Sequence, residues 1–240
     1  MIINTEPHQH PHQHQHPHQT PQPGEHPLLA HLLAAADGRF PEIDGGVTVL
    51  PPFDGGLECS FAFTGHAFVA TRLPAEEVLA QGPDGFGLAH APAFLLHLAG
   101  PGGWVGVTDA SLVARGSGRP GTAPALGERD DFDDHPRVRH ARAVRADVRV
   151  HGDERGFVTV GRGLAGRHEI GIALDEAAGQ KAGRGVGRSL LLDALTLVPE
   201  GEPVFAAVSP GNSRSLRAFL AVGFTPLGSE VLIRPAAGRS

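Results

Sequence analysis

Hydrophobic residues in the C-terminal hundred positions recur with the two-residue period of β-strands. Three successive segments alternate valine, isoleucine or leucine with other residues, and turn-forming residues separate them at 151–154 and 165–167. This pattern predicts three antiparallel strands joined by short turns. The alternating positions are Val148 and Val150, Val158 and Val160, and Ile170, Ile172 and Leu174.

A helical period replaces the alternation after residue 187. Leu190, Leu191, Ala194, Leu195 and Val198 fall on one face of the helix predicted there. The remaining pattern predicts a buried strand at 204–208, a helix from 212 to about 222 and a last strand at 230–233.

The N-terminal half mixes both periods. Leucines at helical spacing predict a helix that begins at residue 28 and ends at the turn signal Asp37-Gly38. Pro74 followed by two acids opens another helix, because proline suits the first turn and acids suit its positive end. Further helices are expected over 91–98 and where acids precede bases in 130–145, and strands at 47–50, 58–63, 66–71, 104–107 and 111–114.

Composition divides the chain into three parts. Residues 1–27 carry histidine at every second position from 8 to 18 among glutamines and prolines, which predicts a disordered tail, since little apolar area is available to offset ordering. Glycine, proline and serine dominate 116–127, the clearest boundary. We therefore expect the tail 1–27, a mixed α/β region of unknown role at 28–117, and a C-terminal domain at 118–240.

Charge and cysteine content exclude several classes of protein. The formal net charge is −6 without a basic block, so capture of nucleic acid is not expected. The single cysteine excludes a disulfide framework, and no apolar run reaches the length of a membrane helix. We therefore expect a cytoplasmic protein that acts on neither nucleic acid nor a membrane.

The glycine-rich loop at 182–189 carries the clearest chemistry. Closely spaced glycines expose successive backbone N–H groups at the start of a helix, which is a cradle for phosphate. The loop does not match a Walker motif, because Ala182 occupies the first glycine position and Arg188 replaces the lysine.

The order of these elements resembles the GNAT superfamily of acetyl-CoA-dependent N-acetyltransferases. The resemblance covers residues 146–236 and depends on the strand at 169–174, the loop and helix at 184–191, and the strand at 204–208. Asn212, Ser215 and the pair Gly223-Phe224 complete the match. It implies an α/β (α+β) fold with a mixed, mainly antiparallel sheet flanked by helices.

The resemblance also implies where acetyl-CoA would bind. Pantetheine would lie against the backbone of the strand at 170–174, and the loop N–H groups would hold the pyrophosphate. Two positions depart from the family pattern: Ala182, where Gln or Arg is usual, and Phe219, where many members carry a tyrosine acid. The predicted acetyl-CoA-binding residues are Ile170, Ile172, Ala173, Leu174, Gly183, Arg184, Gly185, Val186, Gly187, Arg188, Ser189 and Asn212.

Acetyl transfer to an ammonium group needs a proton acceptor. Glu169 is the predicted general base, because it begins the strand where the family often carries one and shares a face with the small residues Gly171 and Ala173. His168 is the second candidate. Asn212 and Ser215 complete the predicted catalytic set, with Ser215 or water as the proton donor to the departing thiolate.

Two other functions fit the same sequence. A member without catalytic activity would bind acyl-CoA and regulate, which the absent tyrosine allows. A metal-handling protein would use the tail histidines, which favour nickel, zinc or copper. The predicted partners are acetyl-CoA and an unknown amine, with a homodimer and weak transition-metal binding by the tail as further expectations; no metal site is predicted elsewhere.

Overall fold

The computed structural model describes residues 25–175 and 185–236. Most of the histidine-rich tail, and Gly183 and Arg184 of the predicted phosphate loop, lie outside the described residues. Within the described part of the chain, no helix is both long and apolar enough to cross a membrane.

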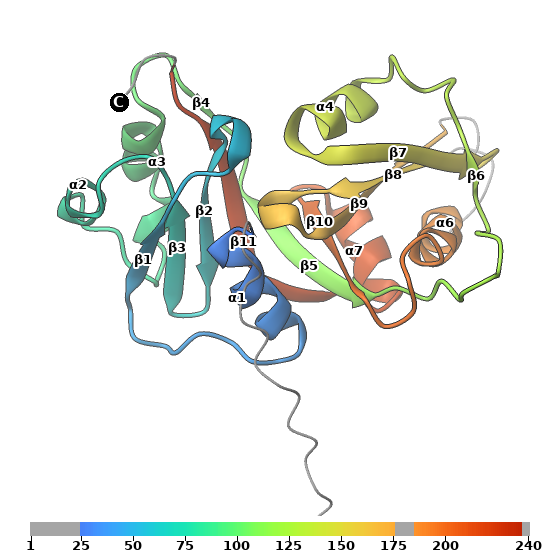
Figure 1. The fold of residues 1–240 in the computed structure, drawn as a ribbon, viewed down its shortest axis with the longest axis horizontal. Coiled ribbons are helices and arrows are strands. Elements are labelled where there is room, and N and C mark those ends of the chain that lie inside the picture. The colour runs from blue at the N-terminus through green and yellow to red at the C-terminus, as the bar shows by residue number, and fades with distance from the viewer. Residues whose placement is uncertain (1–24, 176–184, 237–240) are drawn as a thin grey trace, which may run out of the picture.

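One large mixed sheet organises the molecule (Figure 1). Its strands follow the order β1-β3-β2-β11-β5-β10-β9-β8-β7-β6, and β4 pairs with β11. Most neighbours are antiparallel, with parallel pairs at β1–β3 and β10–β9. The strands are β1 Val47–Leu50, β2 Glu58–Phe63, β3 His66–Ala70, β4 Trp104–Val105, β5 Asp109–Arg115, β6 Gly127–Glu128, β7 Ala146–Asp153, β8 Gly156–Arg162, β9 His168–Leu174, β10 Pro203–Val208 and β11 Thr225–Arg234.

Helices cover both faces of the sheet. Buried residues place α1 and α4 over one face and α2, α3, α6 and α7 over the other. The helices are α1 Pro27–Ala36, α2 Ala75–Ala80, α3 Pro92–Ala99, α4 Pro136–Val144, α6 Val186–Leu195 and α7 Ser213–Ala221, with short 3₁₀ turns at Asp54–Gly56, Leu88–His90 and Leu164–Gly166.

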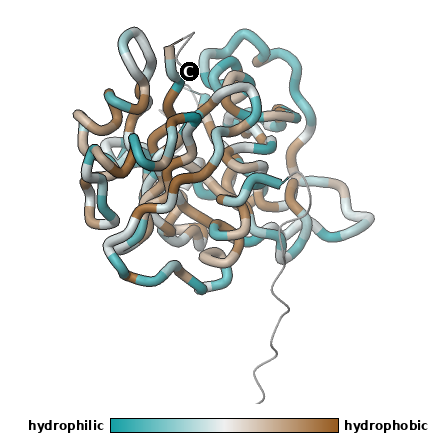
Figure 2. Tube along the Cα trace, turned by 60° about the vertical axis from the view of Figure 1, so that its left-hand side comes forward, coloured by the Kyte–Doolittle hydropathy of each residue, from teal (hydrophilic) through white to brown (hydrophobic). Residues whose placement is uncertain are grey.

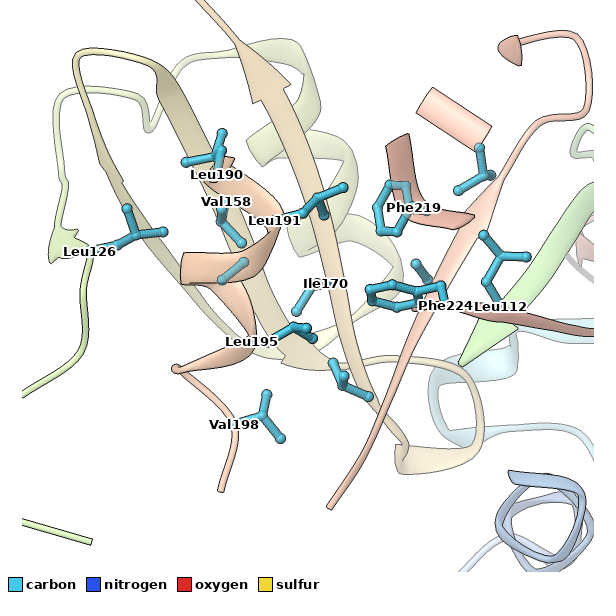
Figure 3. Packing of buried hydrophobic residues seen from close by; sticks show 14 residues of the cluster. Leu112, Leu126, Val158, Ile170, Leu190, Leu191, Leu195, Val198, Phe219 and Phe224 are labelled. Atoms are coloured by element: carbon cyan, nitrogen blue, oxygen red, sulfur yellow. The ribbon is translucent and has the colours of Figure 1, made fainter. Parts of the chain in front are cut away.

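The main core lies between the C-terminal strands and the pair α6 and α7. Figure 3 shows Phe219 and Phe224 close to Leu112, with Ile170 and Leu191 beside them. The two phenylalanine rings meet edge to face, with centroids 4.9 Å apart. Figure 2 shows that, in the described part of the chain, hydrophobic segments run through the interior while hydrophilic loops lie at the periphery.

Strands from the two halves of the chain alternate at the centre of the sheet. The strand β5, from the N-terminal half, lies between β10 and β11 and is antiparallel to both. The strand β11, from the C-terminal half, pairs on its other edge with β2. The predicted boundary at 117 follows β5 directly, so strands from both sides of that boundary share one sheet.

The period-based predictions of the elements are confirmed in most places. The three antiparallel strands are β7, β8 and β9, and a helix occupies each predicted position within the described residues. The last strand is longer than predicted, because pairing with β5 keeps Thr225 to Ser229 extended where the hydrophobic pattern is weak. The strand at 104–107 is shorter, ending at Val105.

Candidate active site

The parallel strands β9 and β10 separate after a single pair of residues. Glu169 of β9 faces Phe205 of β10, and the register continues no further between them. Each strand is fully paired on its other edge, β9 with β8 and β10 with β5. The backbone of β9 beyond Glu169 therefore presents an open edge toward β10.

A cavity of about 510 Å³ fills this gap. Gly171 and Ile172 line it from β9, and Ala207 and Val208 line it from β10. Residues from helices on both faces of the sheet, α4 and α7, also line it. A substrate in the cavity would thus contact groups from both faces where β9 and β10 separate.

Glu169 lies at the closed end of the gap and is held by two arginines. Arg145 Nη2 lies 2.5 Å from Oε1, while Arg167 donates to Oε2 from Nε at 3.1 Å and Nη2 at 2.9 Å. Burial alone would raise the pKa of Glu169, but Arg145 and Arg167 together lower it below its usual value. The predicted base is therefore a cavity residue whose two oxygens are engaged.

Arg167 extends this network to a second carboxylate. Its side chain is fully buried, donates to both oxygens of Glu230 at 2.9 Å and donates from Nη1 to Ser111 Oγ at 3.1 Å. The guanidinium also lies over the ring of Phe205, 5.1 Å from its centroid. One cation thus joins β5, β9 and β11 across the sheet.

A third carboxylate, Asp109, lines the same cavity. It is the first residue of β5 and lies opposite Glu230 in the antiparallel register. Burial, together with the negative charges of Glu230 and Glu169, raises the pKa of Asp109 to about 6.

The helix α7 supplies the polar groups on the opposite face. Asn212 caps this helix, since its Oδ1 accepts a hydrogen bond from Ser215 N at 3.2 Å. Both residues line the cavity, as does Phe219, which is buried. No hydroxyl is present at position 219, so Ser215 is the hydroxyl-bearing residue of α7 at the cavity.

The described part of the phosphate loop begins α6. Gly185 precedes the helix with a φ of 147°, a conformation that favours glycine, and no side chain of the described residues caps the first turn. A Cβ added at Gly187 would meet Leu174 Cδ1 at 3.6 Å, which places the helix start beside the open end of β9. Val186 and Ser189 belong to the first turn, where Ser189 Oγ donates to Val186 O at 3.0 Å.

The remaining residues predicted to bind acetyl-CoA differ in the face of the sheet on which they lie and in their exposure to solvent. Ile170 is buried in the main core, so its backbone is the part available to a ligand. Ala173 packs toward α4, Leu174 is exposed at the end of β9, and Arg188 is exposed on α6.

The second candidate base lies elsewhere. His168 Nδ1 lies 3.2 Å from Glu202 Oε2, burial lowers the pKa of His168, and it does not line the cavity.

Sequence reasoning missed four charged residues of this site: Asp109, Arg145, Arg167 and Glu230. A signal existed for two of them, because Arg167 and Glu230 border or interrupt hydrophobic strands at positions expected to be buried. Asp109 and Arg145 carry no such signal, since charged residues at the ends of strands and helices are common.

Comparisons with known proteins give partial structural similarity. No family model and no curated protein matches the chain. Among solved structures, an acetyltransferase assigned to the GNAT family from Novosphingobium aromaticivorans is 15% identical with a TM-score of 0.36, over 57% of this chain and 69% of that one. A GCN5-related N-acetyltransferase from Kribbella flavida is 13% identical with a TM-score of 0.38, over 63% of this chain and 65% of that one.

A conserved protein of unknown function from Staphylococcus epidermidis is also similar, at 14% identity and a TM-score of 0.32, over 59% of this chain and 66% of that one. These alignments are partial, and the order of the chain's own elements defines the fold. Three antiparallel strands lead through a glycine-rich loop and a helix to a parallel strand that separates from them. The C-terminal half thus has a GNAT-like fold.

Proposed function

We propose that this protein transfers an acetyl group from acetyl-CoA to an amine. The observation that carries the proposal is the single residue pair between β9 and β10, beyond which one cavity is lined from both faces of the sheet. A transferase needs two substrates to meet at one point, and this opening is such a point.

The open edge of β9 suits an extended pantetheine. Backbone groups of Ile170, Ile172, Ala173 and Leu174 lie along the part of β9 that β10 leaves unpaired, so a chain with amide groups can pair there as an added strand. The first turn of α6 lies beside Leu174 and would hold the diphosphate through N–H groups. The proposal includes Gly183 to Ser189 and Asn212 in this binding site.

In this proposal, polar residues on one face of the sheet bind the amine and those on the other face act on the thiolate. The carboxylates, with Glu169 as the predicted general base, lie on the face of α4 and would receive the amine. Ser215 lies at the cavity on α7, and would supply a proton to the thiolate with Phe219 beside it. The proposal keeps the cytoplasmic location expected from the sequence.

Calorimetry with acetyl-CoA and a free-thiol assay over a panel of amines test the proposal. Micromolar binding and amine-dependent thiol release are expected. Binding without release for any amine would favour the regulatory acyl-CoA-binding alternative, which Phe219 and the paired state of Glu169 allow. Absence of binding would reject both.

A further inference from the structure

Three carboxylates face the cavity, and two of them are committed to arginines. Glu169 pairs with Arg145 and Arg167, and Glu230 pairs with Arg167 through both oxygens. Within the described ranges 25–175 and 185–236, no hydrogen bond or ion pair is found for the Asp109 carboxylate. It is therefore the cavity carboxylate that is available to a ligand.

The sheet register places Asp109 on the face of the sheet that carries Glu169 and Glu230, where the amine is proposed to bind. Asp109 and Glu230 are opposite each other in antiparallel strands, so their side chains leave the sheet on the same face. Ser111, two residues on, contacts Arg167 on that face as well. Since Ala110 pairs with Val208, Asp109 lies beyond the last paired residue of β10, at the wide end of the gap.

We propose that Asp109, a residue of the N-terminal half, binds the ammonium group of the acceptor and accepts its proton. This inference rests on the proposed function and deepens it: the acceptor class is an amine that arrives as a cation. Asp109 thus replaces Glu169, the base predicted from the sequence, as the proton acceptor, because both oxygens of Glu169 are engaged by Arg145 and Arg167.

The proton and bond changes balance as follows. The ammonium gives one proton to the Asp109 carboxylate, and the freed nitrogen lone pair forms a bond to the thioester carbonyl carbon. The C–S bond breaks with its electron pair on sulfur, and the second nitrogen proton passes to the thiolate, with Ser215 or water as relay. Asp109 then releases its proton to solvent, which completes the net reaction.

The electrostatics of the cavity support this role. The pKa of Asp109, raised to about 6, makes its carboxylate ionised yet more basic than Glu169, whose pKa is lowered. The titratable and charged groups that face Asp109 across the cavity are Glu169 and Glu230 from the sheet, Arg167 behind them, and Arg137, His140 and Arg145 from α4 and its end.

The decisive experiment compares Asp109→Asn with Glu169→Gln, using Asp130→Asn as the control because Asp130 is exposed and outside the cavity. With a cationic amine at pH 7.5, kcat/KM of Asp109→Asn should fall about 100-fold or more, with acetyl-CoA affinity unchanged. The wild-type rise of kcat/KM near pH 6 should disappear in this variant and persist in Glu169→Gln. With an aromatic amine that is already neutral at pH 7.5, kcat/KM of Asp109→Asn should fall much less.

A stability measurement shows whether Asp109→Asn folds and tests the same carboxylate without a substrate. The folded-state pKa of about 6 exceeds the usual 3.8, so the native state binds the proton more tightly between about pH 4 and 6 and loses stability as pH rises through that range. Asparagine at position 109 carries no charge, so the variant does not lose this stability as the pH rises. The melting temperature should therefore rise by roughly 2–4 °C at pH 7.5 and change little at pH 4.

Each outcome decides the proposal. If Asp109→Asn is folded and keeps kcat/KM within twofold, or if the pH 6 inflection disappears in Glu169→Gln instead, Asp109 is not the proton acceptor and acetyl transfer still stands. If Asp109→Asn does not fold, Asp109→Ala with added formate replaces it, and recovery of activity supports the proposal while its absence opposes it. If the wild-type protein transfers acetyl to no amine, the proposed function fails and this inference fails with it.

Discussion

Arg167 shows how one side chain holds the site together. A fully buried guanidinium is costly unless its donors are satisfied, and here two carboxylates and a hydroxyl accept from it. The same contacts hold the pKa of Glu169 below its usual value, whereas burial, together with the charge of Glu169, raises the pKa of Glu230 despite Arg167. Asp109 has no such partner among the described residues, so its carboxylate can exchange a proton with a ligand.

Replacing Arg167 with Met should destabilise the protein by about 3–5 kcal/mol, because buried Glu230 would lose its arginine partner and buried Glu169 would keep only Arg145. Denaturant unfolding followed by circular dichroism measures the change. The matched control is Arg149→Met, whose ion pair with Glu128 is exposed at both ends and should contribute less than about 0.5 kcal/mol. Equal effects of the two substitutions would contradict the structural role of Arg167.

At the scale of elements, the separation of β9 from β10 determines where the candidate site lies. Pairing of β10 with β5 and of β9 with β8 holds the two strands apart, and the start of α6 lies at the open end beside Leu174. A helix that begins there points its free N–H groups toward any anion that enters the gap.

Gly187→Leu should weaken acetyl-CoA binding at least 100-fold while the melting temperature stays within a few degrees of wild type. A Cβ at this position makes ordinary contacts, at 3.6 Å with Leu174 Cδ1 and 3.9 Å with Ala218 Cβ, whereas the branches of leucine would occupy the space beside the helix start. Calorimetry checks the affinity, with Gly187→Ala as the control that adds the Cβ alone. Unchanged affinity in Gly187→Leu would remove this turn of α6 from the binding site.

At the scale of the whole molecule, the two halves of the chain complete one another. The described neighbours of β11 are β2, β4 and β5, all from the N-terminal half, and β10 has its full-length partner in β5. Asp109 and Ser111 of β5 also belong to the cavity and its network. The N-terminal region is therefore part of the candidate site.

The segment 118–240 expressed alone should fail to form the native fold, because β10 and β11 would have exposed edges and no full partner. Its circular dichroism and gel filtration should report an unfolded or aggregated chain. A full chain cleaved at a protease site inserted near Gly121, in the connection after β5, should instead remain associated and melt near the wild-type temperature. A folded monomeric 118–240 segment would show that the halves are independent domains.

Local sequence patterns were sufficient to predict most elements and one part of the site. The alternation at Ile170 and Ile172 and the helical spacing at Leu190 and Leu191 report which face of each element is buried, because side-chain period follows directly from backbone geometry. The glycines before α6 likewise marked the helix start, and Glu169 was predicted to share a strand face with Gly171, which lines the same cavity.

Strand order and the electrostatics of the cavity depended on contacts between residues far apart in the sequence. Asp109 and Glu230 are 121 positions apart, which follows from their numbers, and only the pairing of β5 with β11 brings them face to face. Likewise, Arg145 follows α4 and reaches Glu169 only in the fold, whereas Arg167 is two positions away along the chain. The sequence by itself determined which segments form strands and helices, since that depends on neighbours within a few residues; the tertiary structure alone decided which carboxylate is paired and which is free, since charge interactions depend on distance in space.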